Sequence, residues 1–341
     1  MTTAPSTPSP ATRDGGSAPV ACPQTGFGLI EVRGSDAAGF LHGQLSSDVQ
    51  SLEPGRAQYS SYNSPKGRML ANLIVLRPPA ALGEDRFLLF LSGDLVETIR
   101  RRLSMFVLRA RVTLRDATGD YAICGLAGPG LAEAARAAFG VVPGVFEALA
   151  LPSGAMLVAV PDGRLLAVCP QSEAASLQAG ILRHARLADT QAWRRHDIDA
   201  GVPWIVAATS DLFVAQAANW EILGGVNFQK GCYPGQEIVA RTQYLGRLKE
   251  RLFAFHAAAP DAAPGSKLHS SAFGDQACGV VVSAAPDALG GCALLAVVQV
   301  AAVDAADLRL DDGARTPLTL QPLPYTVPAA NTQRSRTTTG A

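Results

Sequence analysis

Apolar and polar positions alternate along the first third of the chain in a way that predicts an α+β domain. Strands are expected at three apolar runs, which are residues 27–33, 69–76 and 87–91. Between the first two, Ser35 or Asp36 can cap a helix. After the third, Asp94 can cap a second helix that is expected to end near Met105. Residues 107–114 alternate again and are expected to return as a strand.

A similar rhythm continues through the middle of the chain and predicts a second α+β domain. Its expected elements are a strand at residues 121–125, a helix at 131–139, a hairpin that turns at 161–163 and a helix at 172–186. Beyond residue 247 the pattern changes to short apolar runs separated by Pro, Gly and Asp. These runs, residues 252–256, 278–283 and 293–300, are typical of a small antiparallel β-barrel.

The pattern therefore predicts an α+β multidomain fold with a C-terminal antiparallel β-barrel. We expect a disordered tail over residues 1–22, a first α+β domain over 23–115 completed by part of 187–246, a second α+β domain over 116–186, a linking segment over 187–246, the barrel over 247–326 and a disordered tail over 327–341. Both tails are rich in Ser, Thr, Pro and Ala, which cannot bury enough apolar surface to fold.

Composition and charge exclude several classes of protein. The chain has 341 residues, of which 48% are hydrophobic, and its 29 basic residues balance 29 acidic ones. A zero net charge provides no global attraction to nucleic acid or to an anionic membrane. No apolar run reaches the roughly 18 residues that a membrane span requires, and the first residues lack the pattern of a signal peptide. We expect a cytoplasmic protein that does not bind membranes.

The six cysteines have no spacing that indicates a zinc site or a dithiol centre. They are therefore expected to be reduced thiols, and no resident metal site is predicted. Cys124 and Cys169 lie in apolar, strand-like runs and are expected in the core.

The most chemically crowded stretch is residues 230–237, which read KGCYPGQE. It holds a cation, a thiol, a phenol, an amide and a carboxylate, and it shows neither the strand nor the helix period. Its two glycines and its proline indicate a loop whose backbone turns sharply. Lys230 beside Cys232 can favour a thiolate. A free cysteine is equally often a buried apolar side chain, and the local residues leave both interpretations open.

This motif, followed by IVAR at residues 238–241, resembles the signature of the YgfZ family of folate-binding proteins, which is similar to the aminomethyltransferase T-protein of the glycine cleavage system. Other segments that resemble the family, in the same order, are FLHGQLSSDV at 40–49, NSPKGR at 63–68, AGVPWI at 200–205, QAAN at 216–219 and, more weakly, LPY at 323–325. The resemblance implies a T-protein-like fold over residues 27–325 and a site for tetrahydrofolate or a one-carbon derivative of it.

A folate pocket needs flat apolar walls, a polar group for the pterin edge and cations for the glutamate tail. The resemblance implies that the folate-binding residues are Phe27, Trp193, Lys230, Tyr233, Gln236 and Glu237. Aromatic side chains beside apolar strands are also common in cores, and this alternative stays open for Phe27.

The resemblance makes Cys232 the functional residue and implies a role in maintaining iron–sulfur enzymes, including tRNA-modifying ones. The thiol could bind a cluster iron, exchange with a disulfide or accept sulfur. Because a cluster normally needs four ligands, any cluster would be shared with a partner or a second protomer. The expected partners are folate and iron–sulfur client or assembly proteins.

Two rival functions remain on the sequence alone. The first is a tetrahydrofolate-dependent aminomethyltransferase or demethylase. In the T-protein, paired aspartates follow the loop equivalent to residues 65–68, whereas this chain has Ala71 and Asn72, which cannot move a proton at a folate nitrogen. The second is a tRNA-binding module, which the basic residues between 241 and 251 favour and the zero net charge disfavours.

Overall fold

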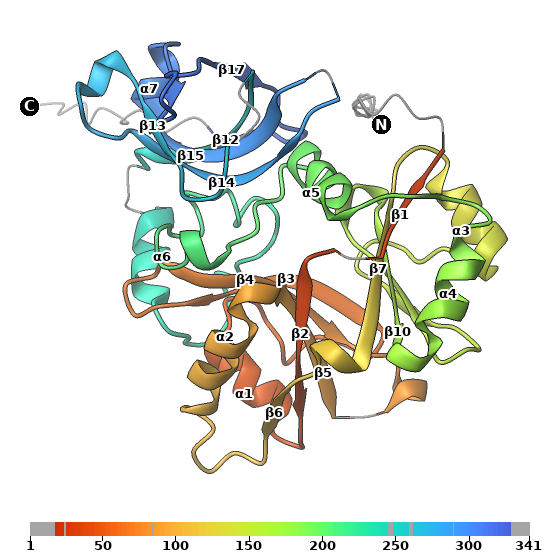
Figure 1. The fold of residues 1–341 in the computed structure, drawn as a ribbon. Helices are drawn as coiled ribbons and strands as arrows, with labels where there is room; N and C mark the ends of the chain where they lie inside the picture. The colour runs from red at the N-terminus through yellow and green to blue at the C-terminus, as the bar shows by residue number, and fades with distance from the viewer. Residues whose placement is uncertain are drawn as a thin grey trace, which may run out of the picture.

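The computed structural model describes residues 18–328 except 24, 84, 245–247, 259–261 and 289. Within that part, the strands form three sheets (Figure 1). The first sheet has the order β3-β4-β5-β2-β6. Its strands are β2 (Phe27–Arg33), β3 (Arg56–Asn63), β4 (Met69–Arg77), β5 (Arg86–Ser92) and β6 (Thr113–Asp116), and its helices are α1 (Ala37–Gln44) and α2 (Val96–Ser104). Neighbouring strands of this sheet are antiparallel.

The second sheet has the order β11-β1-β7-β10-β9-β8. Its elements are β1 (Val20–Cys22), β7 (Tyr121–Ala127), β8 (Ala148–Ala150), β9 (Met156–Ala159), β10 (Leu165–Pro170) and β11 (Arg186–Leu187), with α3 (Leu131–Phe139) and α4 (Ala174–Ile181) packed against it. The hairpin expected at residues 161–163 joins β9 to β10 and is confirmed. The helix expected at 131–139 is also confirmed.

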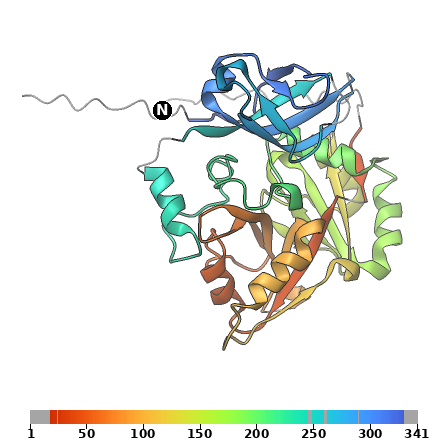
Figure 2. The same cartoon turned by 60° about the vertical axis from the view of Figure 1, so that its left-hand side comes forward.

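The third sheet has the order β16-β13-β14-β15-β12-β17 and is antiparallel throughout. Its elements are β12 (Glu250–Ala257), β13 (Lys267–His269), β14 (Gly279–Pro286), β15 (Cys292–Gln299), β16 (Arg309–Leu310) and β17 (Leu318–Gln321), with the short helix α7 (Val300–Asp304). The expected C-terminal barrel is confirmed as a curled half-barrel (Figure 2).

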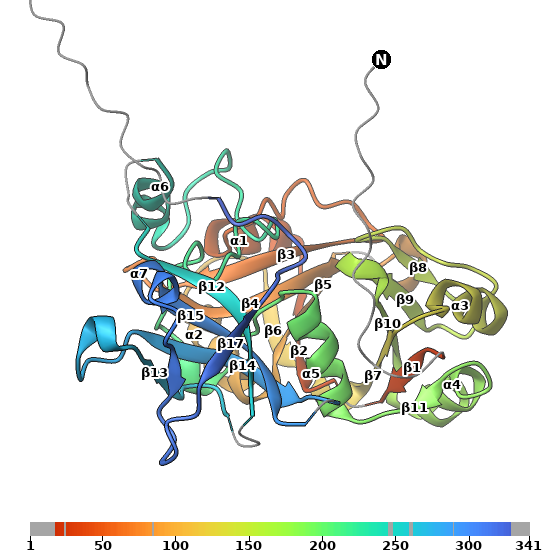
Figure 3. The same ribbon diagram turned by 90° about the horizontal axis from the view of Figure 1, so that it is seen from above.

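Helix α5 (Thr190–Asp199) stands between the second and third sheets (Figure 3). Asp189 caps its N-terminus, because the Asp189 side chain accepts a hydrogen bond from the backbone N–H of Ala192 at 3.0 Å. Helix α5 packs on β14. Its buried Trp193 and Ile198 belong to one core cluster that also contains the inner residues of the first sheet. A long irregular segment then crosses from α5 to helix α6 (Gln236–Tyr244).

Several local expectations are corrected. Val20–Cys22 is a strand and not part of a disordered tail, because it pairs with β7 and with β11 in the second sheet. The strand expected at 107–114 is replaced by a shorter one at Thr113–Asp116, because residues 107–112 form turns and irregular chain in which Leu108 is 88% exposed. The helix expected at 172–186 ends at Ile181, and Arg186 and Leu187 pair with β1 instead. The remaining parts of the two expected tails, residues 1–17 and 329–341, lie outside the described residues.

The two aspartates expected to cap helices make tertiary contacts instead. Asp36 precedes α1 but accepts a hydrogen bond from the backbone N–H of Arg111 at 2.8 Å. Asp94 lies in a 3₁₀ turn before α2 and accepts from the backbone N–H of Ala207 at 2.9 Å. Sequence correctly located both helix starts, but the carboxylates are used to hold distant segments.

Candidate functional site

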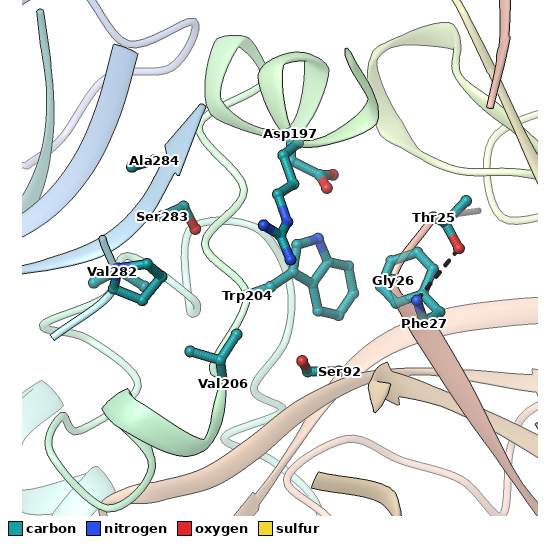
Figure 4. Close-up of a pocket in the computed structure, with 12 residues that line it drawn as sticks. Thr25, Gly26, Phe27, Ser92, Asp197, Trp204, Val206, Val282, Ser283 and Ala284 are labelled. Carbon is teal, nitrogen blue, oxygen red and sulfur yellow. Dashed lines mark hydrogen bonds between the residues drawn. The ribbon is translucent and has the colours of Figure 1, made fainter. Parts of the chain in front are cut away.

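A pocket opens where the first and third sheets meet α5 (Figure 4). Its polar lining residues are Thr25, Ser92, Arg194, Asp197 and Ser283, and its apolar lining residues are Gly26, Phe27, Trp204, Val206, Pro264, Val282 and Ala284. The lining therefore comes from the start of β2, the end of β5, helix α5, the segment after it, and β14. A junction of this kind, with apolar walls and a few polar groups, is where ligand sites commonly occur.

Trp204 forms the central wall of the pocket, and Phe27 packs edge-on against it with ring centroids 4.7 Å apart. Trp220 lies behind Trp204, with the two ring centroids 6.0 Å apart. The ring centroid of Trp220 is also 4.8 Å from that of Tyr59 on β3. The indole N–H of Trp220 donates to the carbonyl of Ser60 at 3.1 Å. The wall is thus backed by a buried aromatic cluster that ties it to the first sheet.

The segment carrying Trp204 is held by Asn72, which is fully buried on β4. The amide Nδ2 of Asn72 donates to the carbonyl of Pro203 at 2.7 Å, and its Oδ1 accepts from the backbone N–H of Ile205 at 2.8 Å. Both sides of the side-chain amide are therefore used, one as donor and one as acceptor. Asn72 stands near the position at which the T-protein has its paired aspartates. In this structure Asn72 holds the segment that forms the pocket wall.

Trp193 is buried at 1% exposure and does not belong to the lining of this pocket. It packs on Gly125 of β7, where an added Cβ would come within 2.3 Å of the indole. The guanidinium of Arg164 lies over its ring, 5.1 Å from the centroid. Trp193 therefore supports the pocket from behind, while Phe27 lies in the lining.

Asp197 lies four residues after Trp193, on the same face of α5, and both face Arg164. The guanidinium Nη1 of Arg164 lies 2.5 Å from Asp197 Oδ1, and both side chains are 5% exposed. Burial raises the pKa of Asp197, and the charge of Arg164 opposes that rise. The pair places an oriented carboxylate at the pocket wall without leaving a buried charge unpaired.

None of residues 230–237 lines this pocket. The loop that they form is held at one end by hydrogen bonds to backbone carbonyls near the end of α1. The ammonium Nζ of Lys230 donates to the carbonyls of His42 and Leu45 at the end of α1, the latter at 2.6 Å. It also lies over the ring of Tyr233, 4.9 Å from the centroid. Burial lowers the pKa of Lys230 to about 8, against the opposing charges of Asp48 and Cys232.

Close backbone packing holds the other end of the loop. At Gly235, which has a φ of +77°, a Cβ would lie 2.4 Å from the carbonyl oxygen of Ser64 and 2.6 Å from the Cα of Gly67. Only glycine fits this approach. The loop is therefore pressed against the turn at residues 64–67, which is the second motif segment of the sequence analysis.

Cys232 is exposed, whereas Cys22, Cys124, Cys169, Cys278 and Cys292 are buried. Glu237 is also exposed, Gln236 is half-buried at the start of α6, and Tyr233 is buried at 7% exposure. The candidate residues thus separate into two groups. Phe27 lies in the pocket with Trp193 behind it, while Lys230, Cys232, Tyr233, Gln236 and Glu237 belong to a separately anchored loop.

Sequence reasoning missed Trp204, Arg194 and Asp197 as pocket residues. All three lie in the segment around α5 whose aromatic and charged content had drawn attention to Trp193. Helical spacing could have paired Trp193 with Asp197, but no local pattern distinguishes a lining tryptophan from a buried one. In the described residues there is no group of three or more His, Cys, Asp or Glu side chains placed to hold a metal ion. Nor does any described helix have the length and apolarity to cross a membrane.

Comparison with known proteins agrees with this architecture. Residues 20–142 match the GCVT N-terminal domain family. The crystal structure of glycine cleavage system aminomethyltransferase T from Bartonella henselae superposes with a TM-score of 0.72 at 17% sequence identity, covering 90% of this chain and 86% of that one. The fold is therefore that of the glycine cleavage T-protein class.

Two proteins named tRNA-modifying protein YgfZ are similar over most of their length. The one from Edwardsiella ictaluri (strain 93-146) is 33% identical over 302 residues, covering 87% of this chain and 89% of the relative. The one from Sodalis glossinidius (strain morsitans) is 30% identical over 307 residues, covering 88% and 91%. The chain belongs to the YgfZ family.

Proposed function

We propose that this protein binds a reduced folate in the junction pocket and, through the thiol of Cys232, supports iron–sulfur proteins, including those that modify tRNA. The observation that carries the proposal is the exposure of Cys232 on a loop whose two ends are fixed to α1 and to the turn at 64–67. A fixed, accessible thiol suits transfer or ligand chemistry, whereas the five buried cysteines do not.

The pocket residues fit a folate. Phe27 and Trp204 offer flat apolar walls for a pterin, Asp197 offers a carboxylate for its N–H groups, and the exposed Arg194 offers a cation for the glutamate tail. When bound, tetrahydrofolate would supply a carrier for one-carbon groups. In this proposal the chain's own part is to bind and orient the folate.

The names of the relatives support the link to tRNA modification. If Cys232 ligates a cluster, the other ligands come from a second molecule, because four are normally needed. Iron–sulfur client or assembly proteins are therefore the partners that we propose, together with folate. We place these activities in the cytoplasm, where thiols stay reduced.

The transferase alternative is weakened by the position of Asn72. Its amide is committed to Pro203 and Ile205, and its neighbour Ala71 is buried. Neither side chain can accept a proton from a folate amine. The proposal therefore assigns the chemistry to the thiol and leaves the folate as a bound effector or carrier.

Direct tRNA binding gains little from the basic residues between 241 and 251. Arg251 is committed to internal contacts, since its guanidinium lies 2.5 Å from Glu221 Oε1 and donates to the carbonyl of Gln216 at 2.7 Å. Arg241 and Lys249 are exposed, and Arg247 lies outside the described residues. We therefore favour an indirect effect on tRNA through client enzymes.

Folate binding is tested by titrating the protein with tetrahydrofolate while recording tryptophan fluorescence, because Trp204 lines the pocket. Arg194→Gln should weaken binding about tenfold, the value of roughly one charge-assisted hydrogen bond. Arg183→Gln, at another exposed arginine on the second domain, is the matched control and should bind normally. An absence of any saturable signal in the wild-type protein would remove the folate site from the proposal.

The role of the thiol is tested by rescue of iron–sulfur enzyme activity in a strain that lacks its own YgfZ protein. Cys232→Ser should abolish rescue and leave folate affinity within a few-fold of the wild type. Gln229→Ala, at an exposed neighbour in the same region, should rescue fully. Full rescue by Cys232→Ser would refute the thiol hypothesis while leaving the folate pocket untouched.

A further inference from the structure

A histidine and an aspartate lie beside the thiol loop, and the proposed function does not use them. His42 is on α1 and Asp48 follows in the connection to β3. The imidazole Nδ1 lies 3.0 Å from Asp48 Oδ1, and the two side chains are 16% and 30% exposed. The other carboxylate oxygen of Asp48 accepts from the hydroxyl of Ser51 at 2.8 Å. Ser51 thereby holds Asp48 beside the imidazole ring.

The remaining imidazole nitrogen, Nε2, faces the thiol loop. It lies 3.5 Å from the point that a Cβ at Gly231 would occupy, which is the residue directly before Cys232. Because Gly231 has no side chain, no side-chain atom of this residue lies between the imidazole ring and the loop backbone. The bonds from Lys230 to the carbonyls of His42 and Leu45 fix the loop against this same end of α1.

A carboxylate and an ammonium group lie beside the imidazole and the thiol loop. Although burial acts to raise it, the pKa of Asp48 is lowered by hydrogen bonds from Ser51 and by the nearby His42. Asp48 is therefore ionised near neutral pH and places a negative charge 3.0 Å from the imidazole Nδ1. The ammonium of Lys230 interacts electrostatically with both Asp48 and Cys232, so the loop thiol lies near a cation.

We propose that Cys232, His42 and Asp48 form a nucleophile, base and orienting group that act on the sulfur–sulfur bond of a disulfide or a persulfide. The inference rests on the role assigned to Cys232 above and specifies the substrate class of that thiol. Cys232, His42 and Asp48 are the residue types found at sites where a base activates a nucleophile and a third residue orients the base.

The step balances without an external oxidant or reductant. The Cys232 thiol gives its proton to His42 Nε2, and the thiolate attacks one sulfur of the substrate S–S bond. A new S–S bond forms to Cys232, the substrate bond breaks, and the leaving sulfur departs as a thiolate that takes the proton back from His42. With a disulfide the product is a mixed disulfide on Cys232. With a persulfide the attack is on the outer sulfur, so the product is a Cys232 persulfide and the leaving group is the substrate thiolate.

The proposal can be tested on the purified full-length chain with 2,2′-dithiodipyridine, a disulfide whose released thione is followed by absorbance. The other five cysteines are buried, so the fast native phase reports Cys232, and Cys232→Ser should remove it. His42→Gln should slow this phase about tenfold or more at pH 6 to 7 and move the midpoint of the pH–rate profile upward. Asp48→Asn should act in the same direction with a smaller effect.

Two further measurements separate a chemical role from a structural one. Thermal unfolding confirms that each variant folds, and added imidazole should restore much of the rate lost in His42→Ala. A folded His42→Gln protein whose pH–rate profile matches that of the wild type would overturn the proposal. So would a folded His42→Ala protein that imidazole leaves slow, together with an unchanged Asp48→Asn.

The substrate arms are glutathione disulfide and glutathione persulfide, with the product on Cys232 identified by mass spectrometry. Either product formed in a His42-dependent manner supports the inference and identifies the source of the S–S bond. Failure of the proposed function is distinguishable, because it is read from strain rescue by Cys232→Ser. A thiol that reacts with the aid of His42 in a protein whose Cys232→Ser variant rescues fully would keep the inference and remove the proposed function.

Discussion

The junction pocket and the thiol loop achieve order in opposite ways. In the pocket, large side chains are buried, and Trp204, Trp220 and Tyr59 hold one another through ring contacts. In the loop, the key side chain of Cys232 is exposed, and order comes from the backbone, through the carbonyls bound by Lys230 and the glycine contact at Gly235. A binding site depends on the shape of packed side chains, whereas a reactive thiol depends on a fixed backbone that leaves it accessible.

The largest effect should come from removing the buried tryptophan behind the pocket wall. Trp220 is fully buried, and Trp220→Ala should lower the free energy of unfolding by about 3–5 kcal/mol, because the cavity cannot close. Cys232→Ala, at the exposed thiol, should change it by less than about 0.5 kcal/mol. Urea denaturation measures both, and equal losses in the two variants would break the contrast between the two regions.

The next effect should come from the clamp behind Trp204. Asn72→Asp replaces an N–H donor with an oxygen that faces the carbonyl of Pro203, and it should cost about 3 kcal/mol because the site is fully buried. The loss should shrink as the pH falls toward the ordinary Asp pKa of about 3.9, since burial raises the pKa in the folded protein and a protonated carboxyl can donate again. Denaturation at pH 4.5 and pH 7.5 tests this; a loss independent of pH would argue against the donor role of Asn72.

A smaller effect is expected at the backbone contact of the loop. Gly235→Ala should cost about 2 kcal/mol and reduce the rescue activity that depends on Cys232, because the new Cβ meets the backbone at Ser64 and Gly67. Gly43→Ala is the matched control, since a Cβ there has no atom within 4 Å and the residue lies in α1. The control should be neutral or more stable by up to about 1 kcal/mol. If Gly235→Ala left the free energy of unfolding unchanged, the close backbone packing at Gly235 would not be what holds the loop.

The smallest effect concerns the pH dependence of Lys230. Its pKa falls from 10.5 to about 8 in the folded protein, so between those values the unfolded chain binds more protons. Stability from this group is complete above 10.5 and is lost as the pH falls through 8. Relative to Lys230→Met, the wild type should gain about 1 kcal/mol from pH 7.5 to 9.5, less than the full shift because the side chain is partly exposed. Parallel pH profiles for the two proteins would contradict the burial of the ammonium.

Local patterns predicted the elements whose burial is simple. The strand at residues 27–33 and the helix at 131–139 were found at their observed bounds. The helix has a regular apolar face, and the strand is a short apolar run whose residues 28–32 are all buried. The alternation at 107–114 misled, since Leu108 lies exposed in a turn and only the last two residues of this range belong to a strand. Strand β3 was not expected, because its buried serines belong to a hydroxyl network that includes Ser46 and Ser60 and that no hydrophobic pattern reveals.

The sequence by itself determined the family, the α+β class and the motif loop that carries Cys232, since these depend on residue order and local chemistry. Only the tertiary structure decided that Trp204 lines the pocket while Trp193 lies behind it, that Asn72 is a clamp, and that Lys230 binds the end of α1. It also brought His42 next to Gly231, 189 positions further along the chain. Such pairings follow from how the sheets pack around α5 and the long segment after it, and long-range packing leaves no periodic trace in the sequence.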